Sequence, residues 1–125
     1  ELYQNNVIPC MERFGKEFGG PVFHSCGNWT KKLSTVKKIK ELTMVDGAFA
    51  AETDPDPNQP GPFGAELANT GIVLNARIVG DADTVVEEVK KIWQPGLKLI
   101  VVTYCATSAE QEQVYHRIHE TCQNK

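Results

Sequence analysis

Four short apolar segments alternate with segments of helical period along the 125-residue chain, and this alternation limits the folds that are open to it. Segments 22–26, 45–51, 72–78 and 99–105 are apolar or rich in small and β-branched residues, which is typical of buried strands. Strands that are nearly all apolar and alternate with helices indicate a parallel sheet covered by helices. Each strand–helix unit takes about 25 residues, so the chain holds four such units.

The predicted helices begin with segment 1–18, in which apolar residues recur at steps of three and four. Pro9 lies inside this segment and predicts either a kink or a regular helix that starts there. Ser108 and Gln111 resemble a capping box at the start of the last helix. The proline-rich segment 52–62 is predicted to be a long loop. The other predicted helices are 30–42, 63–69, a segment from Asp81 or Asp83 to Trp93, and 108–122.

Two architectures fit this order of elements within a single domain, residues 1–125. One is a small, open, doubly wound sheet. The other is half of an eight-fold βα barrel, whose full form takes roughly 250 residues.

The composition excludes several classes of function. The net charge is −3, and no basic stripe with interleaved aromatic residues indicates nucleic-acid binding. No apolar segment is long enough to cross a bilayer, and the first residues do not resemble a signal peptide. We therefore expect the four cysteines to be reduced thiols in a cytoplasmic protein.

Candidate metal ligands lie at the ends of two predicted strands. His24 and Cys26 are two residues apart at the end of the first strand, so their side chains point the same way, and Cys105 ends the fourth strand. In both architectures, ligands bind at the C-terminal ends of the strands. One imidazole and two thiolates suit Zn²⁺, and three protein ligands leave one position open, as in a catalytic site. The alternative is a histidine beside a cysteine in the core.

The sequence His-Ser-Cys-Gly-Asn at 24–28, preceded by Gly-Gly-Pro and followed much later by Cys105, resembles the uroporphyrinogen decarboxylase superfamily. Within it, the chain is most similar to the zinc-dependent, corrinoid-linked methyltransferases, such as methylcobalamin:coenzyme M methyltransferases. The resemblance spans essentially the whole chain. Because family members are barrels of more than twice this length, it implies the C-terminal half of a (β/α)8 TIM barrel: strands five to eight, four parallel strands alternating with helices.

The resemblance also implies a reaction. His24, Cys26 and Cys105 fall on the family's zinc motif, and a zinc-bound thiol loses its proton near neutral pH. That thiolate attacks the methyl group of a methylated corrinoid and leaves Co(I) and a thioether. The implied partners are a small thiol acceptor and methylcobalamin, either free or on a corrinoid protein, with no nucleic acid and no membrane. The parent protein is then an enzyme, whereas the 125-residue chain alone is expected to be inactive.

Three further residues are candidates for substrate binding. Glu52 follows a strand end, although carboxylates in loops are usually just solvated. Asn75 and Arg77 share one strand face, and Arg77 would hold either an anionic substrate group or a structural ion-pair partner.

Other functions stay open at this point. The chain could be a non-catalytic or truncated half-barrel that binds metal or a partner, or a metal-free domain similar to the decarboxylases. Half a barrel also exposes two strand edges, so a homodimer that pairs strand 22–26 with strand 99–105 of a second copy is expected. The alternative to that dimer is an open sheet whose edges are capped by loops or by the first helix.

Overall fold

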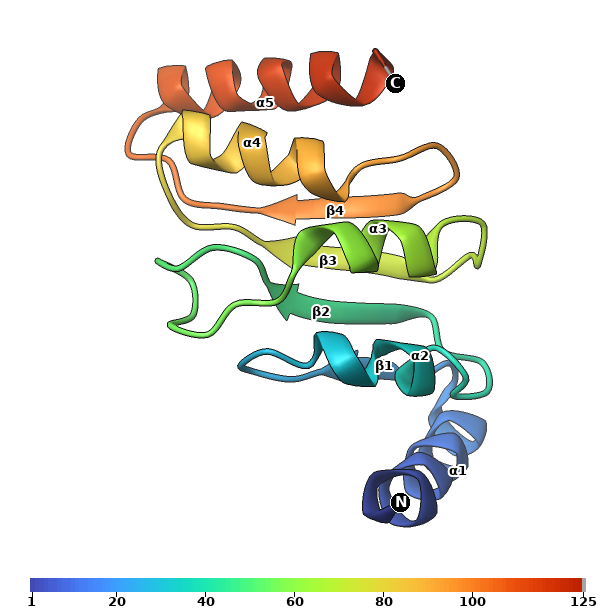
Figure 1. Ribbon diagram of the computed structural model, residues 1–125. Coiled ribbons are helices and arrows are strands. Elements are labelled where there is room, and N and C mark those ends of the chain that lie inside the picture. The colour runs from blue at the N-terminus through green and yellow to red at the C-terminus, as the bar shows by residue number, and fades with distance from the viewer. Residues whose placement is uncertain (125) are drawn as a thin grey trace.

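The computed structural model, described for residues 1–124, is an α/β fold with one four-stranded parallel sheet (Figure 1). The strands lie side by side in chain order, and every neighbouring pair is parallel. This confirms the predicted alternation of parallel strands and helices. The strands are β1 (Val22–His24), β2 (Met44–Ala48), β3 (Val73–Arg77) and β4 (Lys98–Val102).

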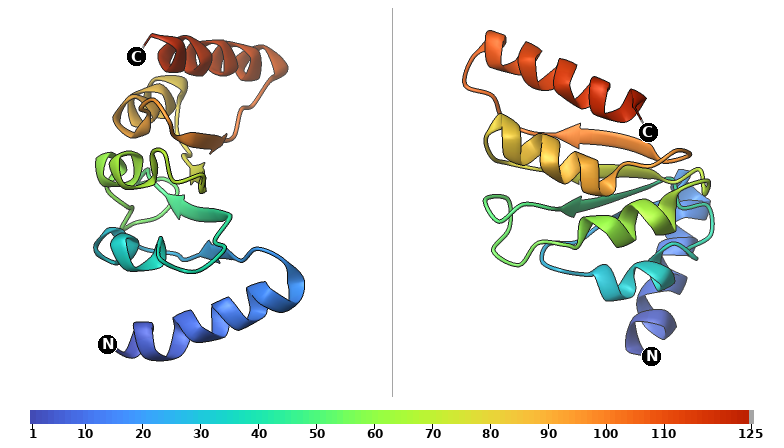
Figure 2. Two further views of the ribbon diagram at one scale, coloured as in Figure 1. Left: turned by 90° about the vertical axis from the view of Figure 1, so that its right-hand side faces the viewer. Right: turned by 45° about the horizontal axis from the view of Figure 1, so that its top comes forward.

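Three of the helices, α2 (Leu33–Val36), α3 (Pro60–Leu67) and α4 (Ala82–Ile92), cover one face of this sheet (Figure 2). Figure 2 shows α2, α3 and α4 on the same side of the strands, because each right-handed crossover between neighbouring parallel strands returns on that side. A doubly wound sheet has helices on both faces, so that alternative is not the one that forms. The helical elements are η1 (Tyr3–Val7), α1 (Ile8–Phe18), η2 (Thr30–Lys32), α2 (Leu33–Val36), α3 (Pro60–Leu67), α4 (Ala82–Ile92) and α5 (Ser108–Gln123).

The core lies between the sheet and these helices. Phe23, Val45 and Leu74 point from the strands toward the helices and are buried. Edge-to-face ring contacts link Phe23 to Trp29 and Trp29 to Phe63, with ring centroids 4.8 and 4.7 Å apart. The predicted helix from Asp81 or Asp83 is confirmed as α4: its valines and Ile92 are buried, and Asp81 caps it by accepting from the Thr84 N–H.

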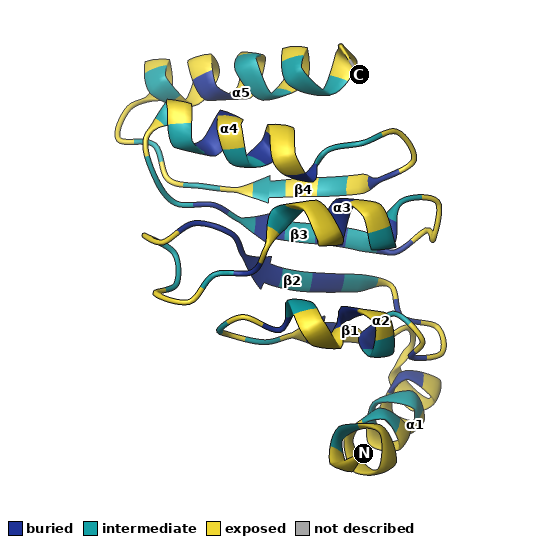
Figure 3. Ribbon diagram, viewed as in Figure 1, coloured by how far each residue is buried: buried dark blue, intermediate teal, exposed yellow. Residues whose placement is uncertain are grey.

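The opposite face of the sheet carries no α2, α3 or α4 helix, and we call it the bare face. Burial alternates along the strands and is lowest in β4 (Figure 3). Val22 and Ile100 on the bare face are each 47% exposed. Both β1 and β4 are edge strands among the described residues, and association of two copies through these edges stays a prediction.

Some predicted boundaries are wrong for local reasons. Helix 30–42 is only a 3₁₀ turn and one α-helical turn, ending at Val36, because the amides of Lys38 and Ile39 bond three residues back rather than four. The last helix is capped by Thr107, which accepts from the Glu110 N–H, while the Glu110 carboxylate accepts from Ala106 N–H. Pro9 lies in the first turn of α1, which directly follows the π-helical segment η1, so the regular α-helix starts beside this proline.

No helix among residues 1–124 is long and apolar enough to cross a membrane. All four cysteines are free thiols.

The contact between α3 and α4 gives a stability test. A Cβ at Gly64 would lie 1.9 Å from the Ile92 carbonyl oxygen, whereas a Cβ at Gly61, in the same helix, would meet nothing within 4 Å. We expect Gly64→Ala to lower the free energy of unfolding by about 1–3 kcal/mol, because the helices must move apart. Gly61→Ala is the matched control and should leave stability unchanged or raise it by up to about 1 kcal/mol. Urea unfolding measures both, and equal stabilities would contradict this packing.

Candidate functional site

His24 is the last residue of β1, and its imidazole is fixed by a neighbouring strand. The side chain is 54% exposed on the bare face. Its register partner on β2 is Asp46, so both side chains leave the sheet on the same side. The imidazole Nδ1 lies 2.6 Å from the Asp46 Oδ2. Because an ionised carboxylate only accepts hydrogen bonds, Nδ1 carries the proton of the neutral ring and Nε2 keeps its lone pair.

Asp46 also binds the third strand. Its second oxygen, Oδ1, accepts a hydrogen bond from Arg77 Nε at 2.9 Å. Burial alone raises the pKa of the Asp46 carboxyl, but the hydrogen bonds from Arg77 and His24 and the positive charge of Arg77 outweigh burial and hold that pKa below its ordinary value. One ionised carboxylate therefore connects side chains from β1, β2 and β3.

Cys26 lies on the free side of the imidazole. Its Sγ is 3.8 Å from His24 Nε2, the nitrogen that Asp46 leaves unprotonated. Two ligands of one tetrahedral zinc, at about 2.1 Å (N) and 2.3 Å (S), are roughly 3.6 Å apart. A metal-binding histidine usually donates its other ring N–H to a carboxylate or carbonyl. The donor types, their separation and the carboxylate behind the ring all fit a zinc ion.

The loop after β2 holds the turn that carries Cys26. Asp54 accepts a hydrogen bond from Gly27 N–H at 2.8 Å, and this bond is the main cause of the lowered pKa of the Asp54 carboxyl. Gly27 has φ +70°, which suits a residue without Cβ. Asn58 is buried; its Oδ1 accepts from the Trp29 N–H at 2.8 Å and its Nδ2 donates to the Ala48 carbonyl. The predicted loop 52–62 therefore exists up to Gln59, because α3 already begins at Pro60, and it fixes the strand end next to it.

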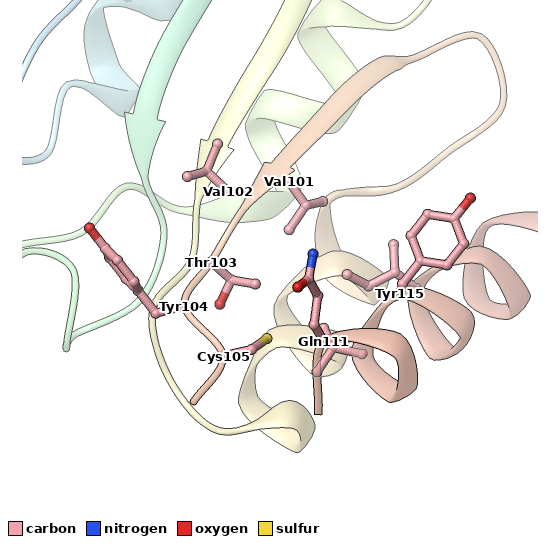
Figure 4. Close-up of a pocket in the computed structure, with 9 residues that line it drawn as sticks. Val101, Val102, Thr103, Tyr104, Cys105, Gln111 and Tyr115 are labelled. Carbon is pink, nitrogen blue, oxygen red and sulfur yellow. The ribbon is translucent and has the colours of Figure 1, made fainter. Parts of the chain in front are cut away.

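Cys105 lies away from this pair. It follows β4, the opposite edge of the sheet from β1, and two strands separate these edges, which corresponds to about 14 Å. Figure 4 shows it in a pocket between the end of β4 and α5, near Thr103 and Gln111, with Tyr104 pointing away. Within residues 1–124, no three His, Cys, Asp or Glu side chains form a group that could hold a metal. The structure thus brings His24 and Cys26 together but leaves Cys105 apart, and the three-ligand site stays a prediction.

The predicted substrate-binding residues lie in different surroundings. Glu52 is exposed on a turn beyond β2. Asn75 is the register partner of Asp46 and shares its face of the sheet. Arg77 makes the ion pair with Asp46 that was one of its two expected roles. Its Nη2 is buried and has no hydrogen-bond partner among the described residues.

Sequence reasoning missed Asp46 and Asn58. Asp46 is the one acidic residue within the apolar segment 45–51, and that was the available signal. Its role depends on which residue of β1 lies opposite it, which is a matter of strand register rather than of local sequence. Asn58 gave no signal, because polar residues are ordinary in a loop.

No family model, curated protein or solved structure shows a significant match to the chain.

The buried amide of Asn58 gives a test of the link between the two loops. Asn58→Ala leaves the Trp29 N–H and the Ala48 carbonyl with fewer hydrogen-bond partners. We therefore expect the free energy of unfolding to fall by about 1–3 kcal/mol. Asn6→Ala, at an exposed position in the N-terminal helical segment, is the control and should change stability by less than about 0.5 kcal/mol. Denaturant unfolding compares the two variants, and a loss no greater than that of the control would show that the amide does not hold the loops.

Proposed function

We propose that the chain is the C-terminal half of a zinc-dependent methyltransferase barrel, which moves a methyl group from a methylated corrinoid to a thiol. The observation that carries this proposal is the pair formed by His24 Nε2 and Cys26 Sγ, 3.8 Å apart, with Asp46 on the far nitrogen of the ring. This pair lies at the C-terminal end of a parallel strand, where α/β enzymes place their chemistry.

The arrangement of the sheet supports the half-barrel. A barrel has its helices outside and its strands inside, so half of one has helices on a single face. The bare face combines exposed apolar residues with the polar group His24, Asp46 and Arg77. A compact monomer of 13.9 kDa exposes about 6,700 Å². This chain exposes 7458 Å², an excess of about 800 Å² that matches one side of a standard protein interface.

In this proposal the residues of the chain bind and orient. His24 and Cys26 hold zinc from one strand end, Asp46 fixes the imidazole, and Asp54 fixes the turn after Cys26. Bound zinc supplies a Lewis acid that keeps an acceptor thiol ionised near neutral pH. Cys105 is the proposed third ligand, and closure of the sheet into a barrel would curve β4 toward β1 and reduce the separation between them.

Metal content tests the ligand set. Protein purified without chelator should carry about one zinc per chain, and His24→Ala, Cys26→Ala and Cys105→Ala should each lose most of it, because two remaining ligands hold zinc weakly. Cys10→Ala is the matched control, since it removes an exposed thiol from α1. Elemental analysis gives the stoichiometry. If Cys26→Ala retained a full equivalent of zinc, the proposed site would be wrong. If Cys105→Ala alone retained it, Cys105 would not be a ligand, whereas the assignment of His24 and Cys26 would stand.

Activity tests how much of the barrel the reaction needs. We expect no transfer from methylcobalamin to a small thiol by the isolated 125-residue chain, because part of the substrate site is missing and a misplacement of about 1 Å can cost roughly a hundredfold in rate. Thioether formation measured against a chain-free blank decides this. Turnover that disappears in Cys105→Ala would show that the chain alone is the complete enzyme.

A further inference from the structure

We infer that Asp46 is a positioning residue, which fixes the tautomer and orientation of His24 so that its Nε2 lone pair faces Cys26. The zinc measurement that tests this inference rests on the proposed function, whereas the geometry from which the inference is drawn does not depend on it. It is carried by one juxtaposition: a single carboxylate lies between an imidazole and a guanidinium, and the thiol lies on the other side of the imidazole.

The tautomer follows from which groups can donate. Arg77 is a donor only, and an ionised carboxylate is an acceptor only. The two oxygens of Asp46 are therefore both used as acceptors, Oδ1 from Arg77 Nε and Oδ2 from His24 Nδ1. The neutral imidazole has one proton, which this bond places on Nδ1. The nitrogen nearest Cys26 is then the one that can bind a metal ion.

Arg77 fixes the carboxylate from the other side. Its Nε–Oδ1 bond prevents Asp46 from rotating away, and the side chain of Asp46 is only 16% exposed. Neighbouring strands supply the three groups, so the sheet itself sets their spacing. His24, in contrast, is half exposed and has no packing role that would hold its ring in one orientation. The carboxylate is what gives this ring a preferred position.

The network is separable from the stability of the fold. It lies on the bare face, outside the buried cluster of Phe23, Val45 and Leu74. Partly exposed ion pairs usually contribute no more than about 1 kcal/mol. A change at Asp46 can therefore alter the imidazole without unfolding the chain, and this makes the inference testable.

Asp46→Asn is the most informative variant, because it keeps the shape of the side chain and replaces one acceptor oxygen by an NH₂ donor. Arg77 can only donate, so the new amide turns its oxygen to Arg77 and presents its NH₂ to His24 Nδ1. The imidazole must then accept at Nδ1 and carry its proton on Nε2, facing Cys26. The matched control is Asp83→Asn, which removes a carboxylate that also pairs with an arginine, Arg117, on the α4–α5 side of the molecule.

The first readout needs no metal. ¹⁵N NMR of the metal-free chain, in alkaline buffer where imidazoles are neutral, reports which ring nitrogen of His24 is protonated, and His24→Gln assigns the signal. We expect Nδ1–H in the wild type and in Asp83→Asn, and Nε2–H in Asp46→Asn. If Asp46→Asn does not fold, Asp46→Ala should replace the single Nδ1–H form by a mixture. An unchanged Nδ1–H form in the folded Asp46 variants would overturn the inference.

The second readout is zinc affinity, measured by competition with a chromophoric chelator. Removal of a carboxylate behind a metal-binding histidine typically weakens binding 10- to 100-fold, so we expect a loss of about that size in Asp46→Asn and none in Asp83→Asn. Equal affinity in the wild type and Asp46→Asn would overturn the inference. If the wild type binds no zinc, the proposed function fails, and the NMR result alone decides whether Asp46 positions His24.

Discussion

The side on which the chain crosses between strands determines most of this structure. Each connection joins a strand to its next neighbour in the same parallel sheet, and such crossovers are right-handed. With strand order β1-β2-β3-β4, all of them return on one face, so that face receives α2, α3 and α4. The hydrophobic core forms there, and the other face is left without these helices. The polar network and the exposed apolar side chains of the strands both lie on that bare face.

The bare face carries two kinds of side chain, apolar and polar, which differ in what burial would do to their free energy. Apolar residues such as Val22 and Ile100 lose favourable burial as long as they face water. The polar residues would be costly to bury alone, but the ion pair of Asp46 with Arg77 and its bond to His24 already satisfy both carboxylate oxygens. A second layer could therefore cover this face without leaving the Asp46 carboxylate unpaired. The proposed half-barrel requires this property of its inner face.

The sequence predicted what depends on local pattern. The alternation of parallel strands with helices and a helix that begins at Asp81 or Asp83 follow from residue type and spacing, and the structure confirms both, with Asp81 as the cap. Prediction from the sequence failed where the conformation or role of a residue depends on backbone hydrogen bonds or on elements that are distant in the chain. Helix 30–42 stops at Val36, because the amides of Lys38 and Ile39 bond three residues back, which the apolar pattern does not reveal. The role of Asp46 depends on its register with His24, and register is a relation between strands 22 residues apart.

The residues of the candidate site also differ in whether local sequence or the whole sheet sets their position. His24 and Cys26 are two residues apart in sequence, so the end of β1 and the bend after it are enough to bring them together, and Asp46 then needs only the correct register. Cys105 requires the curvature of the whole sheet, because it follows the opposite edge strand. A ligand that binds only one conformation stabilises that conformation by an amount set by its concentration and affinity. Zinc held by all three residues would therefore favour the conformation in which β4 approaches β1, and closure of the sheet would in turn strengthen zinc binding. Metal affinity and barrel closure would then be one linked equilibrium, with the preformed half of the site on β1.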